Sequence, residues 1–278
     1  MDVKWLVEDF EGDGSLDPLI SEIKFQGMQC EVVNYIPFQG GEYNQYSDED
    51  CVVFYGSLNL ARQLQREKPW VPGVYCNYEN LCCLTYYSHW AKYLLNDNYI
   101  MLPMMEILRR REFVFNEYGV DNCIWIRPNS GAKTFTGQVI ERERLDREFS
   151  LFSNYAGKPL DKILAVISSP KIISKEWRCV IVDKKVIAAS LYIVNDKLTE
   201  EEGCPEKVWA LAQKIANEEW SPDRAFVLDI CLADGNYYLL EVNSFSSCGL
   251  YKCNTSDIVK AISRAAIDEW KEYQEPLL

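Results

Sequence analysis

The stretch Phe226-Val-Leu-Asp-Ile-Cys-Leu-Ala-Asp-Gly-Asn-Tyr-Tyr-Leu-Leu-Glu-Val-Asn243 contains two apolar runs separated by a turn-forming segment around Gly235. This pattern predicts a β-hairpin. Its two strands carry three polar side chains, Asp229, Glu241 and Asn243. Because side chains alternate along a strand, Glu241 and Asn243 lie on the same face.

The length of the turn decides where the two carboxylates point. A three- or five-residue loop centred on Gly235 places Asp229 opposite Glu241, and we expect this arrangement. A two-residue loop of Asp234 and Gly235 would send the carboxylates to opposite faces. Directly opposed residues have Cβ atoms roughly 5 Å apart. Two carboxylates at that separation repel each other unless a cation or a proton lies between them.

The hairpin therefore predicts a metal site. Asp229, Glu241 and the Asn243 carbonyl offer only hard oxygen ligands, which suit Mg²⁺ or Mn²⁺. Mg²⁺ usually keeps water or phosphate ligands, so a bound nucleotide is expected beside it.

The composition excludes several classes of protein. The chain has 278 residues, of which 48% are hydrophobic, and a net charge of -13, which argues against nucleic acid as a partner. The first residues lack the pattern of a signal peptide, and no run approaches the ~20 apolar residues of a membrane helix. Eleven cysteines and a single histidine favour reduced thiols over disulfides or zinc. We expect a cytoplasmic protein without membrane or nucleic-acid partners.

The first hundred residues alternate short apolar strands with helical segments. This alternation predicts a small three-layer α/β domain with parallel strands over about residues 1–100. The expected elements are Val3 to Val7, Leu16 to Phe25, Cys30 to Tyr35, Cys51 to Tyr55 and Leu58 to Arg66. We interpret Tyr99 to Pro103 as a break between domains.

The next region predicts a β-ribbon that closes over a ligand. Strand Cys123 to Pro128 is followed by a polar, flexible loop and by a second strand, Gln138 to Ile140. Arg127 could clamp phosphates through its planar fork and Lys133 as a point charge. The alternative is an exposed hairpin with ordinary cations, because the loop matches neither the Walker nor the dinucleotide motif.

A third strand, from Glu176 to Val182, carries charge among apolar residues. Alternation puts Glu176 and Arg178 on the same face as Val180. A structural ion pair is possible here, but charge at the start of a buried strand suggests a functional site. A helix over Pro205 to Trp220 and another over Ser256 to Tyr273 complete the predicted elements.

The order of these parts resembles the ATP-grasp superfamily, and the resemblance covers most of the chain. The motifs that carry it are Ile126-Arg-Pro128, Lys133-Thr-Phe-Thr-Gly137, Glu176-Trp-Arg178, Val227-Leu-Asp229 and the segment from Glu241 to Tyr251. Arginine before the proline and the Glu-x-Arg strand resemble the divergent clade that includes the eukaryotic assembly protein for translation initiation factor 2.

This resemblance implies a combined α/β and α+β fold. Residues 1–100 would form the N-terminal three-layer α/β, or pre-ATP-grasp, domain. Residues 101–278 would form the ATP-grasp domain, with a lid subdomain over about 101–168 and a metal-binding subdomain over about 169–278. These two α+β subdomains would enclose ATP.

The resemblance also implies roles for individual residues. Asp229, Glu241 and Asn243 would bind one or two Mg²⁺ ions, with Mn²⁺ as an alternative. The catalytic residues would be Lys133 and Arg178, with Arg178 steadying the transferred phosphoryl group. The ATP-binding residues would be Arg127, Lys133, Ser169, Lys171, Ile172, Ile173, Glu176 and Arg178, with adenine beside Ser169 to Ile173 and ribose at Glu176.

The implied activity is ATP-dependent joining of a carboxylate to an amine through an acyl phosphate, with a peptide or protein as one candidate substrate. Two alternatives stay open. The chain could be an ATP-binding assembly or chaperone-like factor without ligase turnover. It could also be a domain stabilised by Ca²⁺ or Mg²⁺ without a nucleotide, although Arg127, Lys133 and Arg178 would then be unexplained.

Overall fold

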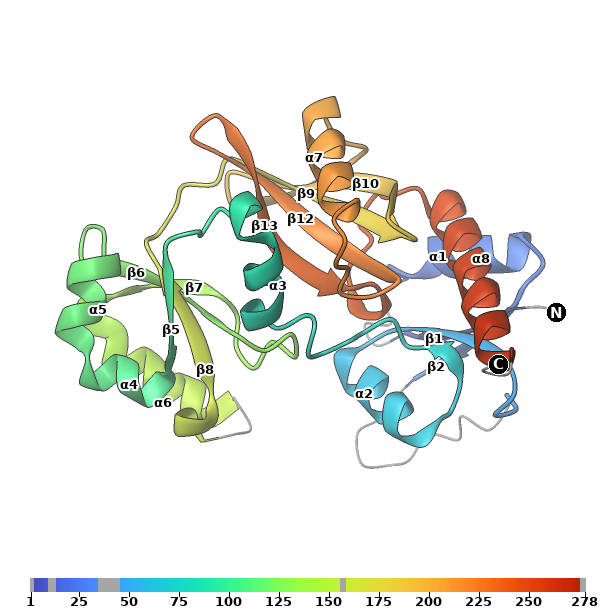
Figure 1. Cartoon of the computed structure of the whole chain (residues 1–278), viewed down its shortest axis with the longest axis horizontal. Helices are drawn as coiled ribbons and strands as arrows, with labels where there is room; N and C mark the ends of the chain where they lie inside the picture. Colours follow the sequence, from blue (N-terminus) through green and yellow to red (C-terminus); the bar gives the residue numbers. More distant parts are fainter. Residues whose placement is uncertain (1–2, 10–13, 35–45, 156–158, 276–278) are drawn as a thin grey trace. The chain divides into compact units, whose positions relative to one another are not determined.

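The computed structural model of the chain describes residues 3–9, 14–34, 46–155 and 159–275 (Figure 1). The chain folds into two compact units, each built from more than one stretch of sequence. Unit 1 comprises Met1–Asn77, Lys175–Ile230 and Glu241–Leu278, and unit 2 comprises Tyr78–Ser174 and Cys231–Leu240. Both contain helices and strands, which confirms the mixed α/β class. The domain boundary near residue 100 stays a prediction.

Unit 1 begins with a parallel sheet of strand order β2-β1-β3-β4. Trp5 and Val7 of β1 pack against side chains of helices α1 and α8, whereas Leu6 between them packs against helix α2. Figure 1 shows α8, the last helix of the chain, beside α1. The predicted three layers and parallel strands are therefore confirmed. The elements are β1 (Lys4–Glu8), α1 (Asp17–Phe25), β2 (Gln29–Val33), β3 (Cys51–Tyr55), α2 (Leu58–Glu67), β4 (Val71–Gly73) and α8 (Thr255–Gln274).

Most of these elements match the predicted ranges within one or two residues. The predicted strand from Cys30 begins at Gln29, and its expected end at Tyr35 lies outside the described residues. Helix α2 starts at the N-cap Ser57, whose hydroxyl oxygen accepts a hydrogen bond from the Leu60 N–H at 3.2 Å.

A second sheet has the strand order β11-β10-β9-β12-β13. Strand β10 is antiparallel to both β9 and β11. Helix α7 buries Val208, Ala212 and Ile215, the apolar side of an amphipathic helix. The sequence analysis did not predict β11, which is charged and mostly exposed. The elements are β9 (Lys175–Val182), β10 (Lys185–Val194), β11 (Lys197–Glu202), α7 (Glu206–Ala216), β12 (Ala225–Ala233) and β13 (Asn236–Ser244).

The turn between β12 and β13 has two residues, so the expected three- or five-residue loop is wrong. Asp234 has φ of 47° and Gly235 has φ of 75°. Positive φ at both central residues is the geometry of the hairpin turn that an Asp-Gly pair favours. That local preference outweighs the longer loop expected for the hairpin.

Unit 2 is built on an antiparallel sheet of order β5-β8-β6-β7, with β6 paired to β7 as predicted. Tyr99–Pro103, interpreted from the sequence as a break, is strand β5, because its backbone pairs with β8. The elements are α3 (Cys83–Trp90), β5 (Tyr99–Pro103), α4 (Met104–Arg109), α5 (Arg111–Tyr118), β6 (Cys123–Pro128), β7 (Gln138–Glu141), α6 (Leu145–Tyr155) and β8 (Leu164–Ser168). Short 3₁₀ helices cover Ala91–Tyr93, Arg142–Arg144, Leu160–Lys162 and Phe245–Ser247.

One face of this sheet forms the core of unit 2. Ile124 and Ile126 of β6 and Ile167 of β8 pack against side chains of α4, α5 and α6. Because side chains alternate, Trp125 and Arg127 lie on the other face. Across both units, none of the helices within the described ranges is long and apolar enough to span a membrane.

We predict that Asp223, just before β12, makes the stability of the fold depend on pH. Burial raises the pKa of Asp223 to about 7, although hydrogen bonds from the backbone N–H groups of Arg224 and Asn77 lower it. The unfolded carboxyl titrates near pH ~4. Between these values the folded chain binds more protons than the unfolded chain, so this carboxyl lowers the free energy of unfolding as pH rises.

The variant Asp223→Asn removes this titration. We expect its free energy of unfolding, measured with urea and compared with wild type, to become more favourable between about pH 5 and about pH 8. The control is Asp97→Asn, because Asp97 is exposed. A difference between Asp223→Asn and wild type that stays constant over this range would contradict the prediction.

Candidate functional site

The candidate site is built around a buried ion pair between β9 and β12. Arg178 Nε donates to Asp229 Oδ1 at 2.9 Å, and Nη2 donates to Oδ2 at 2.8 Å. Asp229 is 1% exposed and Arg178 is 7% exposed. Burial by itself lowers the pKa of Arg178, but attraction to Asp229 outweighs it, so the guanidinium stays charged. This is the two-pronged geometry that arginine forms with carboxylates.

Arg178 also fixes the loop that follows β13. Its Nη1 donates to the Gly249 carbonyl oxygen at 2.9 Å. Its guanidinium carbon lies 5.2 Å from the Tyr192 ring centre and 5.0 Å from that of Tyr251. The two rings stack on each other with centres 4.7 Å apart. One side chain therefore connects β9, β12, β10 and the loop after β13.

Asn243 joins the same cluster. Its Nδ2 donates to Asp229 Oδ2 at 2.9 Å, so its carbonyl oxygen is not used in that bond. An unbroken ladder from the two-residue turn would pair Asp229 with Leu240 and send Asn243 to the opposite face. The hydrogen bond therefore requires one extra residue in a strand between the turn and the site, which is the effect of a β-bulge.

Glu176 and Glu241 add two more carboxylates. The Tyr192 hydroxyl donates to Glu176 Oε2. Burial raises the pKa of Glu176, the hydrogen bond from Tyr192 lowers it, and repulsion from Asp229 and Glu241 raises it further. Glu241 is thus close enough to act on Glu176. The structure therefore brings together five of the residues expected from the sequence, which are Glu176, Arg178, Asp229, Glu241 and Asn243.

The chemistry of this donor set fits a hard divalent cation. Three carboxylates, Glu176, Asp229 and Glu241, surround one arginine, and this excess of negative charge favours a bound cation. Both Asp229 oxygens already accept hydrogen bonds, whereas the Asn243 carbonyl stays available. Within the described ranges, no group of three His, Cys, Asp or Glu side chains could hold a metal alone. Phosphate or water oxygens would complete the coordination of Mg²⁺.

A network of serines holds the loop after β13 against the N-terminal sheet. Ser246 Oγ accepts from the Tyr75 N–H at 2.9 Å and donates to the Phe54 carbonyl at 2.8 Å. The Gly56 N–H donates to the Ser246 carbonyl at 2.8 Å. Ser244 Oγ donates to the Tyr75 carbonyl at 3.0 Å. These bonds fix the end of the strand that carries Glu241 and Asn243.

In unit 2, Arg127 lies on the sheet face that turns away from the helices. It is 8% exposed, and its Nη1 donates to the Tyr86 hydroxyl at 3.2 Å. Strand register places Arg127 beside Val166 and Trp125 beside Ser168. Ser168 Oγ is fully buried and finds no hydrogen-bond partner in the parts of the chain that the structure describes. The sequence analysis missed Ser168, which directly precedes the expected adenine-binding segment.

The segment from Ser169 to Ile173 has no regular structure and leads into β9. Ile172 is 87% exposed and Lys171 is also exposed, whereas Ile173 packs against a small apolar cluster with Leu95. Ser174 N–H then donates to the Leu232 carbonyl at 2.9 Å.

Lys133 lies in the loop of the predicted ribbon, with φ of 48°. Its N–H donates to the Ser130 carbonyl at 3.1 Å, which closes a turn. Two residues later, Phe135 is buried and stacks on Phe152 with ring centres 4.5 Å apart. The loop that the sequence suggests is polar and flexible is therefore packed to the core of unit 2 by one aromatic side chain.

A cavity of about 510 Å³ in unit 1 lies next to the ion pair. It opens where the strand order reverses between β1 and β3, a position at which α/β sheets commonly bind ligands. Glu8, at the end of β1, is buried there, and its carboxylate accepts the Ser57 N–H at 2.7 Å. Burial raises the pKa of Glu8. The cavity lining includes Ser15, Gly56, Glu200, Gly249, Tyr251 and Lys252.

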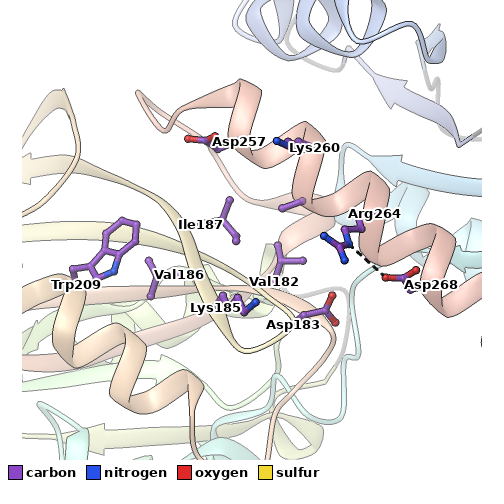
Figure 2. A pocket seen from close by; sticks show the side chains of 11 residues that line it. Val182, Asp183, Lys185, Val186, Ile187, Trp209, Asp257, Lys260, Arg264 and Asp268 are labelled. Atoms are coloured by element: carbon purple, nitrogen blue, oxygen red, sulfur yellow. Dashed lines mark ion pairs between the residues drawn. The ribbon is translucent and has the colours of Figure 1, made fainter.

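Unit 1 holds a second cavity of about 560 Å³ between α7, α8 and the start of β10 (Figure 2). Figure 2 shows Trp209 at one side and Lys260 and Arg264 of α8 at the other. Its floor is apolar, with Val182, Val186 and Ile187. None of the site residues expected from the sequence lines this cavity.

Residues 110–261 match a family model described as an ATP-grasp domain, family 2 of its clade. The chain belongs to the ATP-grasp superfamily. This membership, together with the ATP-grasp fold, makes it an enzyme of the ATP-dependent ligase class. The relation to the translation-factor assembly protein, which the sequence suggests, stays an expectation.

Solved structures share this fold at low sequence identity. The D-cycloserine synthetase DcsG aligns over 95% of this chain and 99% of its own, with a TM-score of 0.61 and 12% identity. D-alanine–D-alanine ligase from Bacillus anthracis aligns over 98% and 99%, with a TM-score of 0.60 and 15% identity. The ATP-grasp ligase PsnB, complexed with a minimal precursor, aligns over 95% and 100%, with a TM-score of 0.55 and 13% identity. No curated protein matches the sequence.

We predict that Asp229→Asn destabilises the ATP-grasp fold itself. Asparagine cannot balance the buried charge of Arg178, and an uncompensated charge of this kind costs about 3–5 kcal/mol. Guanidinium-induced unfolding should show a correspondingly lower free energy of unfolding. The control Asp234→Asn changes an exposed turn residue and should unfold like wild type. Equal unfolding midpoints for Asp229→Asn and wild type would contradict a stabilising role of the pair.

Proposed function

We propose that the chain joins a carboxylate to an amine at the expense of ATP, through an acyl-phosphate intermediate. The observation that supports this proposal best is the cluster of Arg178, Asp229 and Asn243 with the carboxylates of Glu176 and Glu241. It combines a buried cation with an excess of hard oxygen donors. Phosphoryl transfer needs fixed cations around the transferred group and a divalent metal to neutralise its charge.

In this proposal Glu241, Asn243 and Asp229 hold Mg²⁺. The metal neutralises the phosphate oxygens and bridges them when bound. Because both Asp229 oxygens accept hydrogen bonds from Arg178 and Asn243, Asp229 also orients the Asn243 amide. Glu241 then carries the larger share of metal binding that is separable from folding.

Arg178 serves the transferred phosphoryl group as well as the fold. An arginine has five N–H groups, and three of those of Arg178 bind Asp229 and Gly249. The two others, one on each terminal nitrogen, are not used in these bonds. A guanidinium held in place by three hydrogen bonds can stabilise developing charge without rearranging.

Residues of unit 2 supply the nucleotide contacts. Arg127 and Lys133 bind the phosphates, Arg127 with its position set by Tyr86. Adenine lies against the segment Ser169 to Ile173, where Lys171 and Ile172 are exposed to receive it. On β9 in unit 1, Glu176 binds the ribose, with its carboxylate oriented by a hydrogen bond from Tyr192.

The cavity of about 510 Å³ is the proposed site for the acid or the amine. Its lining combines Lys252 with Glu200, so it offers opposite charges to a substrate that carries both. A peptide or protein is one candidate, since PsnB structures contain a precursor peptide. We further propose that the protein is cytoplasmic, because all eleven cysteines are free thiols.

The proposal is tested first by ATP binding and then by turnover. Mg²⁺-ATP should raise the melting temperature, because a ligand that binds only the folded state stabilises it. Phosphate release should then increase when a matching acid and amine are added together. Tight ATP binding without stimulated release would favour an assembly factor, and no melting shift with ATP would contradict both roles.

We predict that Glu241→Gln abolishes turnover while leaving the fold intact. The change removes a negative ligand but keeps the size of the side chain, so Mg²⁺-ATP should no longer raise the melting temperature. The melting temperature without ligand should stay near that of wild type. Glu201→Gln, on exposed β11, is the matched control. ATP turnover at the wild-type rate in Glu241→Gln would contradict the proposed metal site.

A further inference from the structure

Two thiols of unit 1 lie in contact on the far side of β9 from the ion pair. Cys179 follows Arg178 in β9, so its side chain points to the opposite face. Cys179 is fully buried. Cys204 lies in the loop between β11 and α7 and is partly exposed. A hydrogen bond joins the two sulfur atoms.

Backbone pairing keeps the two thiols together. Cys179 pairs with Ala189 in the ladder between β9 and β10. The Gly203 N–H donates to the Ala189 carbonyl at 2.8 Å. The residue before Cys204 is thus bound to the residue opposite Cys179, and the contact does not depend on side-chain rotamers alone.

Cys204 has the surroundings of a reactive thiol. It directly precedes Pro205, the N-cap of the 11-residue helix α7. The hydrogen bond from Cys179 lowers the pKa of Cys204, burial opposes this, and the backbone N–H of Trp209 lowers the pKa further. A helix N-terminus stabilises a thiolate, which is the nucleophilic form. Cys30 has a similar exposure class, but burial raises its pKa to about 11.

We propose that Cys179 and Cys204 are a redox-active pair that forms a reversible disulfide when a hydroperoxide oxidises the protein. The Cys204 thiolate attacks the peroxide, and its sulfur is oxidised to a sulfenic acid while the O–O bond breaks and hydroxide leaves. The Cys179 sulfur then attacks that sulfur, and the S–OH bond breaks. Cys179 gives up its proton, so water is released as the S–S bond forms.

This disulfide would join β9, at the residue beside Arg178, to the start of α7. It links positions 25 residues apart (204 − 179) and restrains the unfolded chain. The inference does not rest on the proposed ligase activity, because the thiols lie on the face of β9 away from Arg178.

The other close pair of cysteines is a poor alternative. Cys248 and Cys253 follow β13 and are both buried. Burial raises the pKa of both thiols, that of Cys248 to about 11. The Cys248 thiol donates to the Phe245 carbonyl at 3.3 Å and the Cys253 thiol to that of Arg178 at 4.0 Å. Neither thiol is thus aimed at the other.

The test oxidises the full chain with hydrogen peroxide at low excess, blocks remaining thiols with iodoacetamide, and maps peptides without reduction. We expect a joined peptide containing Cys179 and Cys204 before any other cysteine is oxidised. Dithiothreitol should restore both thiols. The oxidised protein should melt at a higher temperature, and this increase should be absent in Cys204→Ser and present in the control Cys30→Ser.

Three outcomes would overturn the proposal. One is that Cys204 reaches the sulfinic acid while Cys179 stays a thiol. Another is that the peptide joining Cys248 and Cys253 forms first. The third is that Cys204→Ser and wild type show the same increase in melting temperature on oxidation. Because the mapping uses wild-type protein, a variant that fails to fold does not affect the first two.

Discussion

The bidentate contact between Arg178 and Asp229 brings together parts of the chain that are far apart in sequence. It is buried, so breaking it would leave an unbalanced charge inside the protein. Asp229 in turn holds Asn243, and Arg178 holds Gly249. The strand pairing of β9 and β12, the position of Asn243 and the loop after β13 therefore depend on one ion pair. A site residue can in this way be a structural residue at the same time.

The loop after β13 connects this cluster to the N-terminal sheet of unit 1. Ser246 is bonded to Tyr75, Phe54 and Gly56 at once. The C-terminal helix α8 then covers the face of that sheet that includes Trp5. A cluster of acidic groups repels itself, and a rigid frame of this kind keeps Glu176, Asp229 and Glu241 close without relaxation. Such fixed charge is what a metal-dependent phosphoryl transfer uses.

Sequence patterns predicted much of the fold where one interaction dominates. The limits of Cys51–Tyr55, Cys123–Pro128 and the start of α2 follow from apolar runs and a serine cap. The site residues on β9, β12 and β13 followed from alternation and from the family motifs. The strand Tyr99–Pro103 was missed because its assignment depends on pairing with β8, which no local pattern encodes. The same holds for Ser168, whose orphaned hydroxyl is apparent only once its surroundings are packed.

Local sequence was enough to single out the residues of the candidate site, because charge in an apolar strand and a strict alternation are properties of short segments. It was not enough to show how those residues pair. The Asp-Gly turn took its own preferred geometry, and only an irregularity farther along the hairpin brings Asn243 to Asp229. That Arg178 neutralises Asp229, and that Cys179 meets Cys204, depends on contacts between residues 51 and 25 positions apart. Such contacts form only when the whole sheet is assembled, so they follow from the three-dimensional fold and not from any local pattern.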